Sequence, residues 1–226
     1  MEQSDNILST FFDRTFERCI NEKMFYRDYA FPEEDVMAYA ESILAVPMNR
    51  FVAFIRENCC IPYLEFNDIV QFSSLYDATV GIVTVLENNG DEGFTFIDIG
   101  RMLLDDGKVR NDMAYRKYGE NHAKTAKEFG LTQILFCKTY LTCIGKILNH
   151  FDVFEQQKLL RRLILRNRYV ELIIKISASE KISIDSQMGL LSESTRIRRR
   201  SNVIKIWQLI IEEDKSITEA LSNVIV

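Results

Sequence analysis

The sequence predicts a mainly α-helical protein in which a helical N-terminal unit is followed by one or two helix-turn-helix units with minor β structure. Three observations lead to this fold class. Apolar residues recur three and four positions apart along much of the chain, which is the spacing of one helix face. The 226 residues include only 9 Gly and 3 Pro, and 47% are hydrophobic, so a buried core can form. Short apolar periods separated by Gly turns in the middle of the chain are typical of helix-turn-helix units.

The charge of the chain is divided between its two halves. Up to Asp106 there are 20 Asp and Glu against 7 Lys and Arg, a balance of −13. From Gly107 onward there are 13 against 21, a balance of +8, and the two halves together give the net charge of −5. Such asymmetry indicates that the basic half meets a polyanion while the acidic half has another role.

Residues 1–74 are predicted to form an acidic helical unit. A three-four apolar spacing predicts a helix over Asp5–Lys23. Pro32 followed by three acidic residues is typical of a helix start, because acids are favoured at the positive end of the helix dipole. Pro47 ends that helix, and Met48–Glu57 forms another. This unit is a candidate surface for a protein partner or for a homodimer.

Residues 75–150 are predicted to form a helix-turn-helix-like unit with a long connecting helix. A helix over Leu75–Leu86 precedes a short extended piece at Phe94–Phe96. Three short helices separated by tight turns follow, over Ile97–Leu104, Asn111–Tyr118 and Asn121–Phe129. Gly119 is expected to separate the second of these helices from the third. The strongly apolar run Thr132–His150 predicts a buried connecting helix.

Residues 151–226 are predicted to form a second unit of the same kind. One or two helices are expected within Phe151–Ile176, with four arginines on their outer faces: Arg161, Arg162, Arg166 and Arg168. The alternation of Ile182 and Ile184 is consistent with a short strand within residues 177–186. The last long helix is expected over Arg196–Glu213.

The segment Gly189–Arg200, GLLSESTRIRRR, carries the clearest motif. In a helix-turn-helix, a Gly turn precedes a Ser or Thr that caps the groove-entering helix and leaves its first-turn groups free for phosphates and bases. Ser192 or Ser194 fits as this cap. We therefore expect nucleic acid to be bound by the residues of this segment and the following turns, namely Ser192, Ser194, Thr195, Arg196, Arg198, Arg199, Asn202 and Lys205.

Helical geometry, at about 100° per residue, divides this last helix into two faces. An apolar face is predicted to point into the protein, comprising Ile197, Val203, Ile204, Trp207, Ile210 and Ile211. The opposite face is predicted to carry Arg198, Ser201, Asn202 and Lys205. Arg199 falls at the edge, and Arg200 falls on the apolar side. The alternative interpretation is a solvated basic face, or arginines that pair with the acidic half of the chain.

A second basic cluster surrounds the predicted short helices, with Lys108, Arg110, Arg116, Lys117, His122, Lys124 and Lys127. The segment after Gly130 is too apolar to read a DNA groove. We therefore expect Asn111–Tyr118 to be the reading helix of this unit, with Phe94–Phe96 as its associated strand. The side chains predicted to face outward and bind nucleic acid are Asn111, Tyr115, Arg116 and Lys117.

Two segments carry a family resemblance. STRIRRRSNVIKIW resembles the S/T-x-x-RR-x-x-T-V-x-x-W signature near the end of winged-helix modules attached to bacterial restriction-modification and related defence proteins. YGENHAKTAKEFGLT is similar to the Tyr-Gly-Glu…Gly-Leu segment that can precede it. The resemblance covers residues 75–212 and departs at Ile204, where the pattern prefers Val, and at Ser201, where Ala is commoner.

This resemblance implies one or two winged-helix units and a non-catalytic DNA-binding part of such a system. It carries over onto Thr195, Arg198, Arg199 and Trp207. In that family pattern Trp207 would be a core anchor and not a contact residue.

The sequence contains none of the common catalytic motifs GxxxxGK(S/T), GxSxG, GxGxxG or HExxH. It has 2 histidines, too few for a histidine metal cage, and its 5 cysteines form no CxxC pair. We therefore expect no metal site and no cofactor, with the cysteines as small core residues. No apolar run indicates a signal peptide or a membrane span, so a cytoplasmic protein without a membrane partner is expected.

The leading hypothesis is a DNA-binding protein, the specificity or regulatory part of a restriction or defence system. Its arginines would contact phosphates while a helix enters a groove of double-stranded DNA. The first alternative is a helical adaptor or regulatory subunit that binds another protein through its acidic half. The second is a metal-dependent nuclease, for which Asp98, Asp106 and Lys108 supply the residue types.

Overall fold

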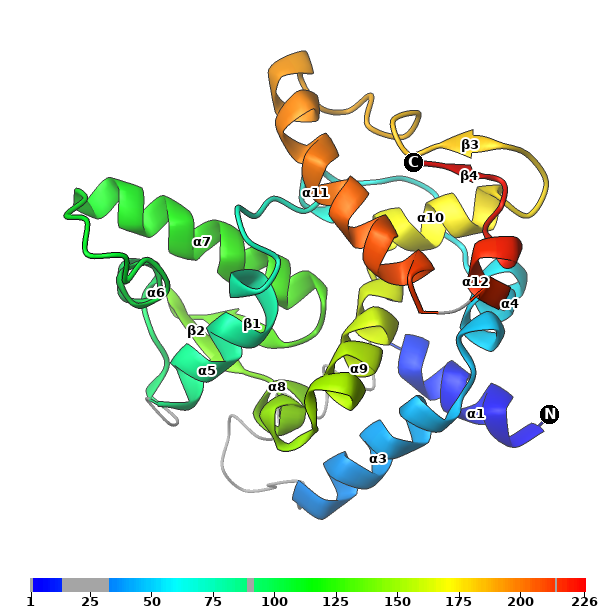
Figure 1. The fold of residues 1–226 in the computed structure, drawn as a ribbon, viewed down its shortest axis with the longest axis horizontal. Coiled ribbons are helices and arrows are strands. Elements are labelled where there is room, and N and C mark those ends of the chain that lie inside the picture. The colour runs from blue at the N-terminus through cyan, green and yellow to red at the C-terminus, as the bar shows by residue number, and fades with distance from the viewer. Residues whose placement is uncertain (1, 14–32, 89–91, 214) are drawn as a thin grey trace.

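The computed structural model describes residues 2–13, 33–88, 92–213 and 215–226 (Figure 1). Helices make up most of these residues, and their β structure is limited to two small two-stranded sheets. The predicted mainly α fold with minor β structure is confirmed. None of the described helices is long and apolar enough to cross a membrane. The predicted extension of the first helix to Lys23, and Pro32 at the start of the next, lie outside the described residues.

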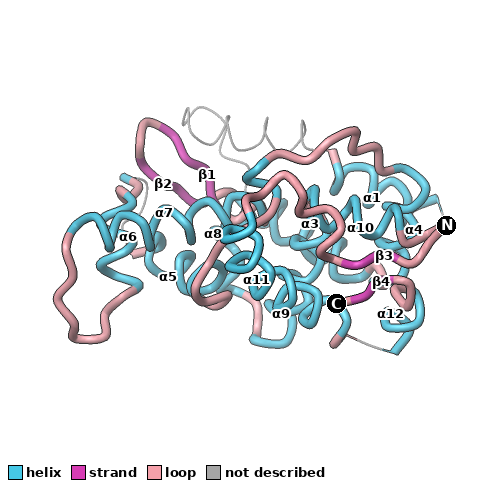
Figure 2. The backbone as a smooth tube through the Cα atoms, turned by 90° about the horizontal axis from the view of Figure 1, so that it is seen from above, coloured by secondary structure: helices cyan, strands magenta, loops and turns pink. Residues whose placement is uncertain are grey.

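The N-terminal helices pack against helices from the other end of the chain. They are α1 (Glu2–Phe12), α3 (Glu33–Ala45) and α4 (Met48–Asn58). α4 lies against α10 (Arg168–Ile176) and α12 (Lys215–Ala220). Figures 1 and 2 both place α4 and α12 at the same end of the molecule. Segments from the first and last thirds of the chain therefore share one core.

The middle of the chain forms three helices and a hairpin. A π-helical turn (Asp77–Gly81) leads into α5 (Ile82–Glu87), which is followed by α6 (Phe96–Leu103) and α7 (Asp112–Glu128). The strands β1 (Thr132–Leu135) and β2 (Lys138–Leu141) pair antiparallel directly after α7. The backbone of Phe94 exchanges two hydrogen bonds with Thr139 of β2, at 3.1 and 2.8 Å. The predicted extended piece thus begins at Phe94, beside the hairpin, although Phe96 already belongs to α6.

The prediction of one buried helix over Thr132–His150 is wrong. The chain reverses at Phe136 and Cys137, whose positive φ angles of 49° and 62° form the turn between β1 and β2. α8 (Cys143–Ile147) then begins after Thr142, whose hydroxyl caps it, and a 3-10 turn (Leu148–His150) follows. Apolar content alone does not distinguish a short strand from a buried helix. Pairing of β2 with Phe94, which lies far away in the sequence, stabilises the strand.

α7 is one continuous helix, so the prediction of a break at Gly119 is also wrong. A Cβ atom on Gly119 would lie 2.0 Å from the carbonyl oxygen of Phe96. A Cβ atom on Gly100 of α6 would lie 1.9 Å from the carbonyl oxygen of Tyr115. The two glycines therefore allow the backbones of α6 and α7 to touch, which is a packing role and not a turn.

The C-terminal third is helical with one small parallel sheet. α9 (Val153–Leu165) and α10 account for the helices predicted within Phe151–Ile176. β3 (Ile182–Ser183) pairs in parallel with β4 (Val224–Ile225), which confirms the short strand within residues 177–186. Between them lie α11 (Glu193–Ile211), which packs on α9, and α12.

The prediction that the arginines of α9 lie on its outer face is wrong, since Arg161 and Arg162, and Arg166 directly after the helix, are all buried. Arg162 Nη1 lies 3.1 Å from Glu213 Oε1, and the two side chains are only 3% and 9% exposed. Arg161 donates to the carbonyl oxygen of Leu209 at 2.9 Å. The Arg166 guanidinium lies over the ring of Phe11. These partners are distant in the sequence, so helix periodicity could not indicate them.

We expect Gly100→Ala and Gly119→Ala each to lower the free energy of unfolding by about 1–3 kcal/mol, because a backbone carbonyl cannot move aside as a side chain can. Gly189→Ala is the matched control. Its Cβ would meet nothing within 4 Å and its φ is not positive, so a change within about 0.5 kcal/mol is expected. Urea denaturation measures all three variants, and equal stabilities would contradict the close contact of α6 and α7.

Glu213→Gln should destabilise the protein by about 3–5 kcal/mol, because Arg162 would keep a buried charge without its carboxylate. Burial already lowers the pKa of Arg162, and Glu213 opposes that shift. Asp185→Asn is the control, since it removes the partner of Arg200 where both side chains are 38% or more exposed. That change should stay within about 1 kcal/mol. Comparable decreases in thermal or urea unfolding would argue against a specific role for the buried pair.

Candidate nucleic-acid interface

The buried face of α11 agrees with the prediction at Val203, Trp207 and Ile210 but differs from it in the first turns of the helix. The residues buried on it lie three or four positions apart along most of its length, namely Thr195, Arg199, Asn202, Val203, Ile206, Trp207 and Ile210. Ile197, predicted to point inward, is 66% exposed, and Asn202, predicted to face solvent, is buried. The buried stripe that includes Trp207 continues toward the start of the helix, where the buried side chains are polar: Thr195, Arg199 and Asn202. Trp207 itself is fully buried, as expected of a core anchor.

The first turn of α11 begins after Ser192, one of the two residues predicted to cap it. Its hydroxyl, however, bonds to the Thr195 hydroxyl at 3.0 Å and to no backbone amide of the helix. Arg198 Nη2 also donates to Thr195 Oγ1, at 3.2 Å. Arg200, predicted on the apolar side, is exposed and pairs with Asp185 at 2.9 Å. The predicted contact residues of this helix that remain on the surface are Ser192, Ser194, Arg196, Arg198 and Lys205.

Arg199 is one of three predicted contact residues that are instead buried, with Thr195 and Asn202, and 5% of it is exposed. Its Nη1 donates to the carbonyl oxygen of Phe66 at 2.6 Å and to that of Ile69. Its guanidinium lies 3.9 Å from the centroid of the Phe66 ring. The chain around Ile69 pairs with no strand among the described residues, and side chains supply partners for its backbone groups. Arg199 therefore fastens this segment to α11.

The start of α7 carries the second group of predicted contact residues. Asn111 caps the helix, since its Oδ1 accepts from the Ala114 amide at 2.8 Å. The Tyr115 hydroxyl donates to the carbonyl oxygen of Lys108 at 3.1 Å and accepts from the Arg110 amide at 3.2 Å. Tyr115 thus braces the preceding loop and is not the outward contact that was predicted.

Two predicted contacts of α7 are available to a partner. Arg116 and Lys117 are exposed, and neither forms an ion pair with a residue in the described part of the chain. Two acids nearby are occupied, because Asp112 pairs with Arg101 at 2.7 Å and Asp106 pairs with Arg110 at 2.6 Å. Arg116 and Lys117 thus form an exposed positive surface on the first half of α7.

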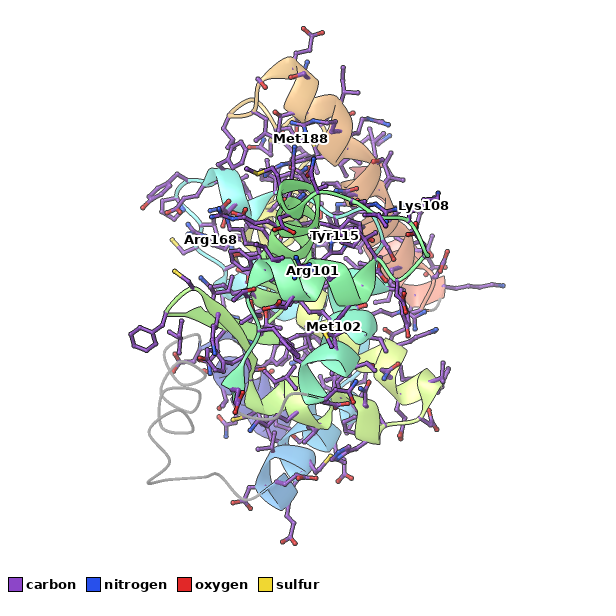
Figure 3. The ribbon with its side chains drawn as sticks, turned by 90° about the vertical axis from the view of Figure 1, so that its left-hand side faces the viewer. Arg101, Met102, Lys108, Tyr115, Arg168 and Met188 are labelled. Carbon is purple, nitrogen blue, oxygen red and sulfur yellow. The ribbon has the colours of Figure 1, made fainter. Side chains whose placement is uncertain are left out.

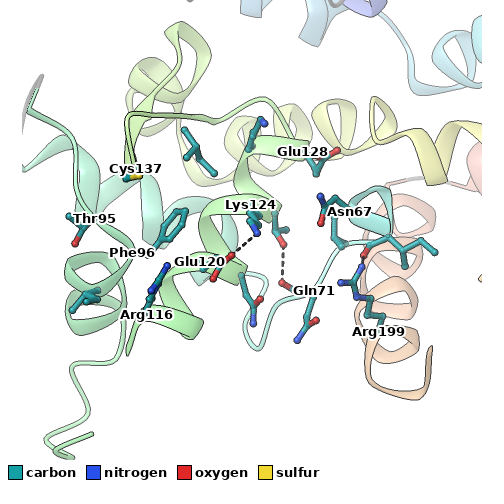
Figure 4. A pocket seen from close by; sticks show the side chains of 17 residues that line it. Asn67, Gln71, Thr95, Phe96, Arg116, Glu120, Lys124, Glu128, Cys137 and Arg199 are labelled. Carbon is teal, nitrogen blue, oxygen red and sulfur yellow. Dashed lines mark hydrogen bonds and ion pairs between the residues drawn. The ribbon is translucent and has the colours of Figure 1, made fainter. Parts of the chain in front are cut away.

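A groove of about 610 Å³ runs beside α7 (Figure 4). One wall comes from the hairpin and the start of α6, with Thr95, Phe96, Ile134 and Cys137. The other wall comes from the segment 67–71 and from Arg199. Between them α7 contributes Arg116, Glu120, Lys124, Lys127 and Glu128. Lys124 pairs with Glu120 at 2.6 Å, so among the α7 cations that line the groove Arg116 and Lys127 form no ion pair with a described residue.

The second wall of the groove is held to α7 by buried polar side chains. Thr125 Oγ1 donates to the carbonyl oxygen of Gln71 at 3.1 Å. His122 Nε2 faces the amides of Ser73 and Ser74, at 3.3 and 3.4 Å, so it must act as an acceptor. The other ring nitrogen, Nδ1, lies 2.7 Å from the carbonyl oxygen of Tyr118 and donates to it. His122 is therefore neutral, and burial lowers its pKa.

Sequence reasoning missed the wall formed by Asn67 and Gln71 and the contribution of Thr95 to the groove. These residues lie at least 16 positions away from the start of α7 at Asp112 and carry no charge. No local pattern marks them, because their place is set by contacts to α7 and α11. The basic residues of α7, in contrast, could be found from the clustering of lysine and arginine.

The acids considered for a nuclease site have structural roles. The Thr95 hydroxyl donates to Asp98 Oδ2 at 2.5 Å and accepts from the Asp98 amide, which caps α6. The Arg110 guanidinium holds the pKa of the Asp106 carboxyl well below its usual range. The described residues contain no group of three or more His, Cys, Asp or Glu that could hold a metal ion. The expectation that the cysteines are core residues is wrong for Cys60 and Cys137, which are exposed.

Comparison of the chain with family models, with curated proteins and with solved structures gives no match. The resemblance to winged-helix modules of restriction and defence proteins therefore stays an expectation based on short motifs.

The neutral state of His122 predicts a pH dependence of stability. Burial lowers the pKa of His122 in the folded protein, whereas in the unfolded chain the ring accepts a proton below a pH of about 6.5. The free energy of unfolding should therefore be highest above that pH and decrease as the pH falls below it. His122→Gln should flatten the slope of the unfolding free energy between pH 7 and about 5.5. Asn121→Gln, which changes a neighbouring polar side chain of α7 that does not titrate, is the control and should keep the slope. An unchanged slope in His122→Gln would contradict this role.

Proposed function

We propose that the protein binds double-stranded DNA through α7 and the β1–β2 hairpin, with residues 75–150 acting as a winged-helix unit. The observation that carries the proposal is the exposed basic surface of α7 beside the hairpin. Arg116, Lys117, Lys124 and Lys127 all lie on the solvent side of this helix. Cations at such spacing suit contacts with the phosphates that border a DNA groove.

The order of the elements supports this proposal. α5 is followed by the edge piece at Phe94, by α6, by α7 and by the hairpin. In a winged helix the helix before the hairpin enters the major groove, and the hairpin contacts the flanking backbone. Close packing of α6 on α7 at Gly100 and Gly119 gives the reading helix a rigid support.

The position of α7 in the molecule also supports the proposal. Figure 3 views the molecule from the side at which α6 and α7 begin, with Arg101, Lys108 and Tyr115 around the start of α7. In Figure 1 the N-terminal end of α7 projects from the left-hand side, away from α1, α4 and α12. A duplex could approach this end without meeting the N-terminal helices.

α11 suits a lesser role than the one predicted from its motif. A groove-entering helix needs its first turns free, whereas Thr195, Arg199 and Asn202 pack inward. Arg196, Arg198 and Lys205 remain exposed and could contact phosphates beside the main site. A place in a restriction or defence system is the further part of this hypothesis and depends on the motif resemblance alone.

Replacing Arg116 and Lys117 together by Gln should weaken duplex binding and reduce the log–log salt slope by about 0.9 for each phosphate that the variant no longer neutralises. The unfolding free energy should change by less than about 0.5 kcal/mol, because both side chains are exposed. Replacing Arg196, Arg198 and Lys205 by Gln should have a smaller effect. Fluorescence anisotropy of a labelled duplex at several salt concentrations measures both sets.

The control is the pair Lys181→Gln and Lys215→Gln, which removes two exposed charges away from α7 and should leave affinity nearly unchanged. Absence of binding by the unaltered protein, or a flat salt dependence, would reject the proposal and favour an adaptor that binds another protein. Equal decreases of affinity in the α7 variant and the control would show a nonspecific effect of net charge.

A further inference from the structure

The end of the groove holds a buried cation whose charge is not neutralised. Arg199 is 95% buried yet lines the groove beside Asn67 (Figure 4). Both acceptors of its Nη1 are neutral backbone carbonyls. No carboxylate in the described part of the chain lies within ion-pair distance of it. A buried charge of this kind normally has a counter-charge, because water no longer screens it.

The hydrogen-bonding capacity of Arg199 is also incomplete. Its Nε is buried and has no partner. A guanidinium presents five N–H donors in a planar fork, and only those of Nη1 are engaged here. Nη2 has no partner among the described residues either, and it is the nitrogen through which Arg199 can bind an oxygen of a phosphate or carboxylate.

The buried arginines of the chain differ in their partners, since Arg161 also donates to a backbone carbonyl whereas another has a carboxylate. Arg162, equally buried, has Glu213 as its counter-charge, and the exposed Arg200 has Asp185. Arg199 instead has Arg198 as its charged neighbour, and burial together with this like charge lowers the pKa of Arg199. An anion in the groove would replace the missing carboxylate.

The rest of the groove favours an anionic group of a polymer over a free inorganic ion. Arg116 and Lys127 lie along the same groove as Arg199, and Glu120 is already paired with Lys124. Between these cations the lining includes apolar side chains, among them Phe96, Ile134, Ile69 and Val70. Spaced cations over an apolar surface suit a sugar-phosphate backbone better than an isolated inorganic ion.

We propose that this groove binds a backbone phosphate of the nucleic acid, with Arg199 as its buried cation and Arg116 and Lys127 as neighbouring contacts. The proposal rests on the DNA-binding function proposed above and adds a second contact to it, between α7 and the segment 67–71. One strand would then lie along the groove on the side of α7 that faces α11. The segment 67–71 has a direct binding role as well as a structural one.

The decisive variant is Asn67→Asp, which places a carboxylate beside Arg199 at an exposed position and removes no buried group. The matched control is Gln157→Glu, which adds the same charge at an exposed position of α9 outside the groove. Arg199→Gln is a second variant, whose unfolding must be measured first because Arg199 also holds the chain at Phe66 and Ile69.

The first measurement is thermal unfolding of the whole chain with inorganic pyrophosphate as the probe, at constant ionic strength. Pyrophosphate should raise the unfolding temperature of the unaltered protein and of Gln157→Glu, and this increase should be absent in Asn67→Asp. Equal increases in all three proteins, or no increase in any, would overturn the phosphate site.

The second measurement is the salt dependence of duplex binding. Asn67→Asp should reduce the log–log slope by about 0.9 relative to Gln157→Glu, the decrease expected for one phosphate contact. If the unaltered protein binds DNA and the two variants have the same slope, this inference is rejected while the proposed function stands. If no DNA binds but the pyrophosphate effect depends on Asn67, the anion site is supported and its assignment to DNA is overturned.

Discussion

A buried stretch of chain without a neighbouring strand is the constraint on which the rest of the structure depends. Between Tyr63 and Ser74 the chain passes from α4 to the π-helical turn and buries Ile69, Val70 and Phe72. Buried backbone groups must be hydrogen-bonded, and in this segment side chains of distant helices supply partners in addition to the turn bond from the Asp68 amide to the Glu65 carbonyl oxygen. Side-chain partners come from three helices. They are Arg168 and Asn167 at the start of α10, Arg199 of α11, and Thr125 and His122 of α7.

This constraint explains why the basic residues divide into two groups. Arg168 donates to the carbonyl oxygen of Tyr63, and Arg199 donates to those of Phe66 and Ile69, so both hold the segment in place. Arg162 is committed in a similar way to Glu213 and to the carbonyl oxygen of Val46. Exposed cations on α7 and on one side of α11 remain available to a partner. The charge excess of the second half therefore overstates the positive surface of the protein.

The same contacts connect the proposed binding surface with the helical body. The segment 66–74 is attached to α11 at one end, through Arg199, and to α7 at the other, through His122. The groove lies between these attachments, so its width depends on both. A change at either end would shift the wall formed by Asn67 and Gln71 relative to α7. The binding proposed along the groove and the packing of α7 on the body would thus be coupled by one short piece of chain.

Helix positions could largely be predicted because their determinants are local. Apolar periodicity, the acidic first turn of α3 and the capping side chain of Asn111 all lie within a few residues of the elements they define. The prediction of a break at Gly119 was wrong because glycine permits either a turn or the close approach of two backbones. The neighbouring carbonyl oxygen of Phe96, which is visible only in the folded protein, shows that Gly119 has the second role. The hairpin at β1 and β2 was missed for a related reason, since its partner Phe94 is remote in sequence.

The sequence by itself determined the mainly helical fold, most of the helix boundaries and the concentration of cations around α7 and α11, since each follows from composition and short-range spacing. Only the tertiary structure decided which cations reach solvent. The predicted faces of α11 were wrong at Ile197 and Asn202, because a helix buries whatever side its neighbours cover, and the carbonyl groups of Phe66 and Ile69 bind Arg199, which was predicted at the edge. Long-range hydrogen bonding of an otherwise unpaired backbone leaves no periodic pattern in the sequence, so the groove and its buried arginine had to be found in the folded protein.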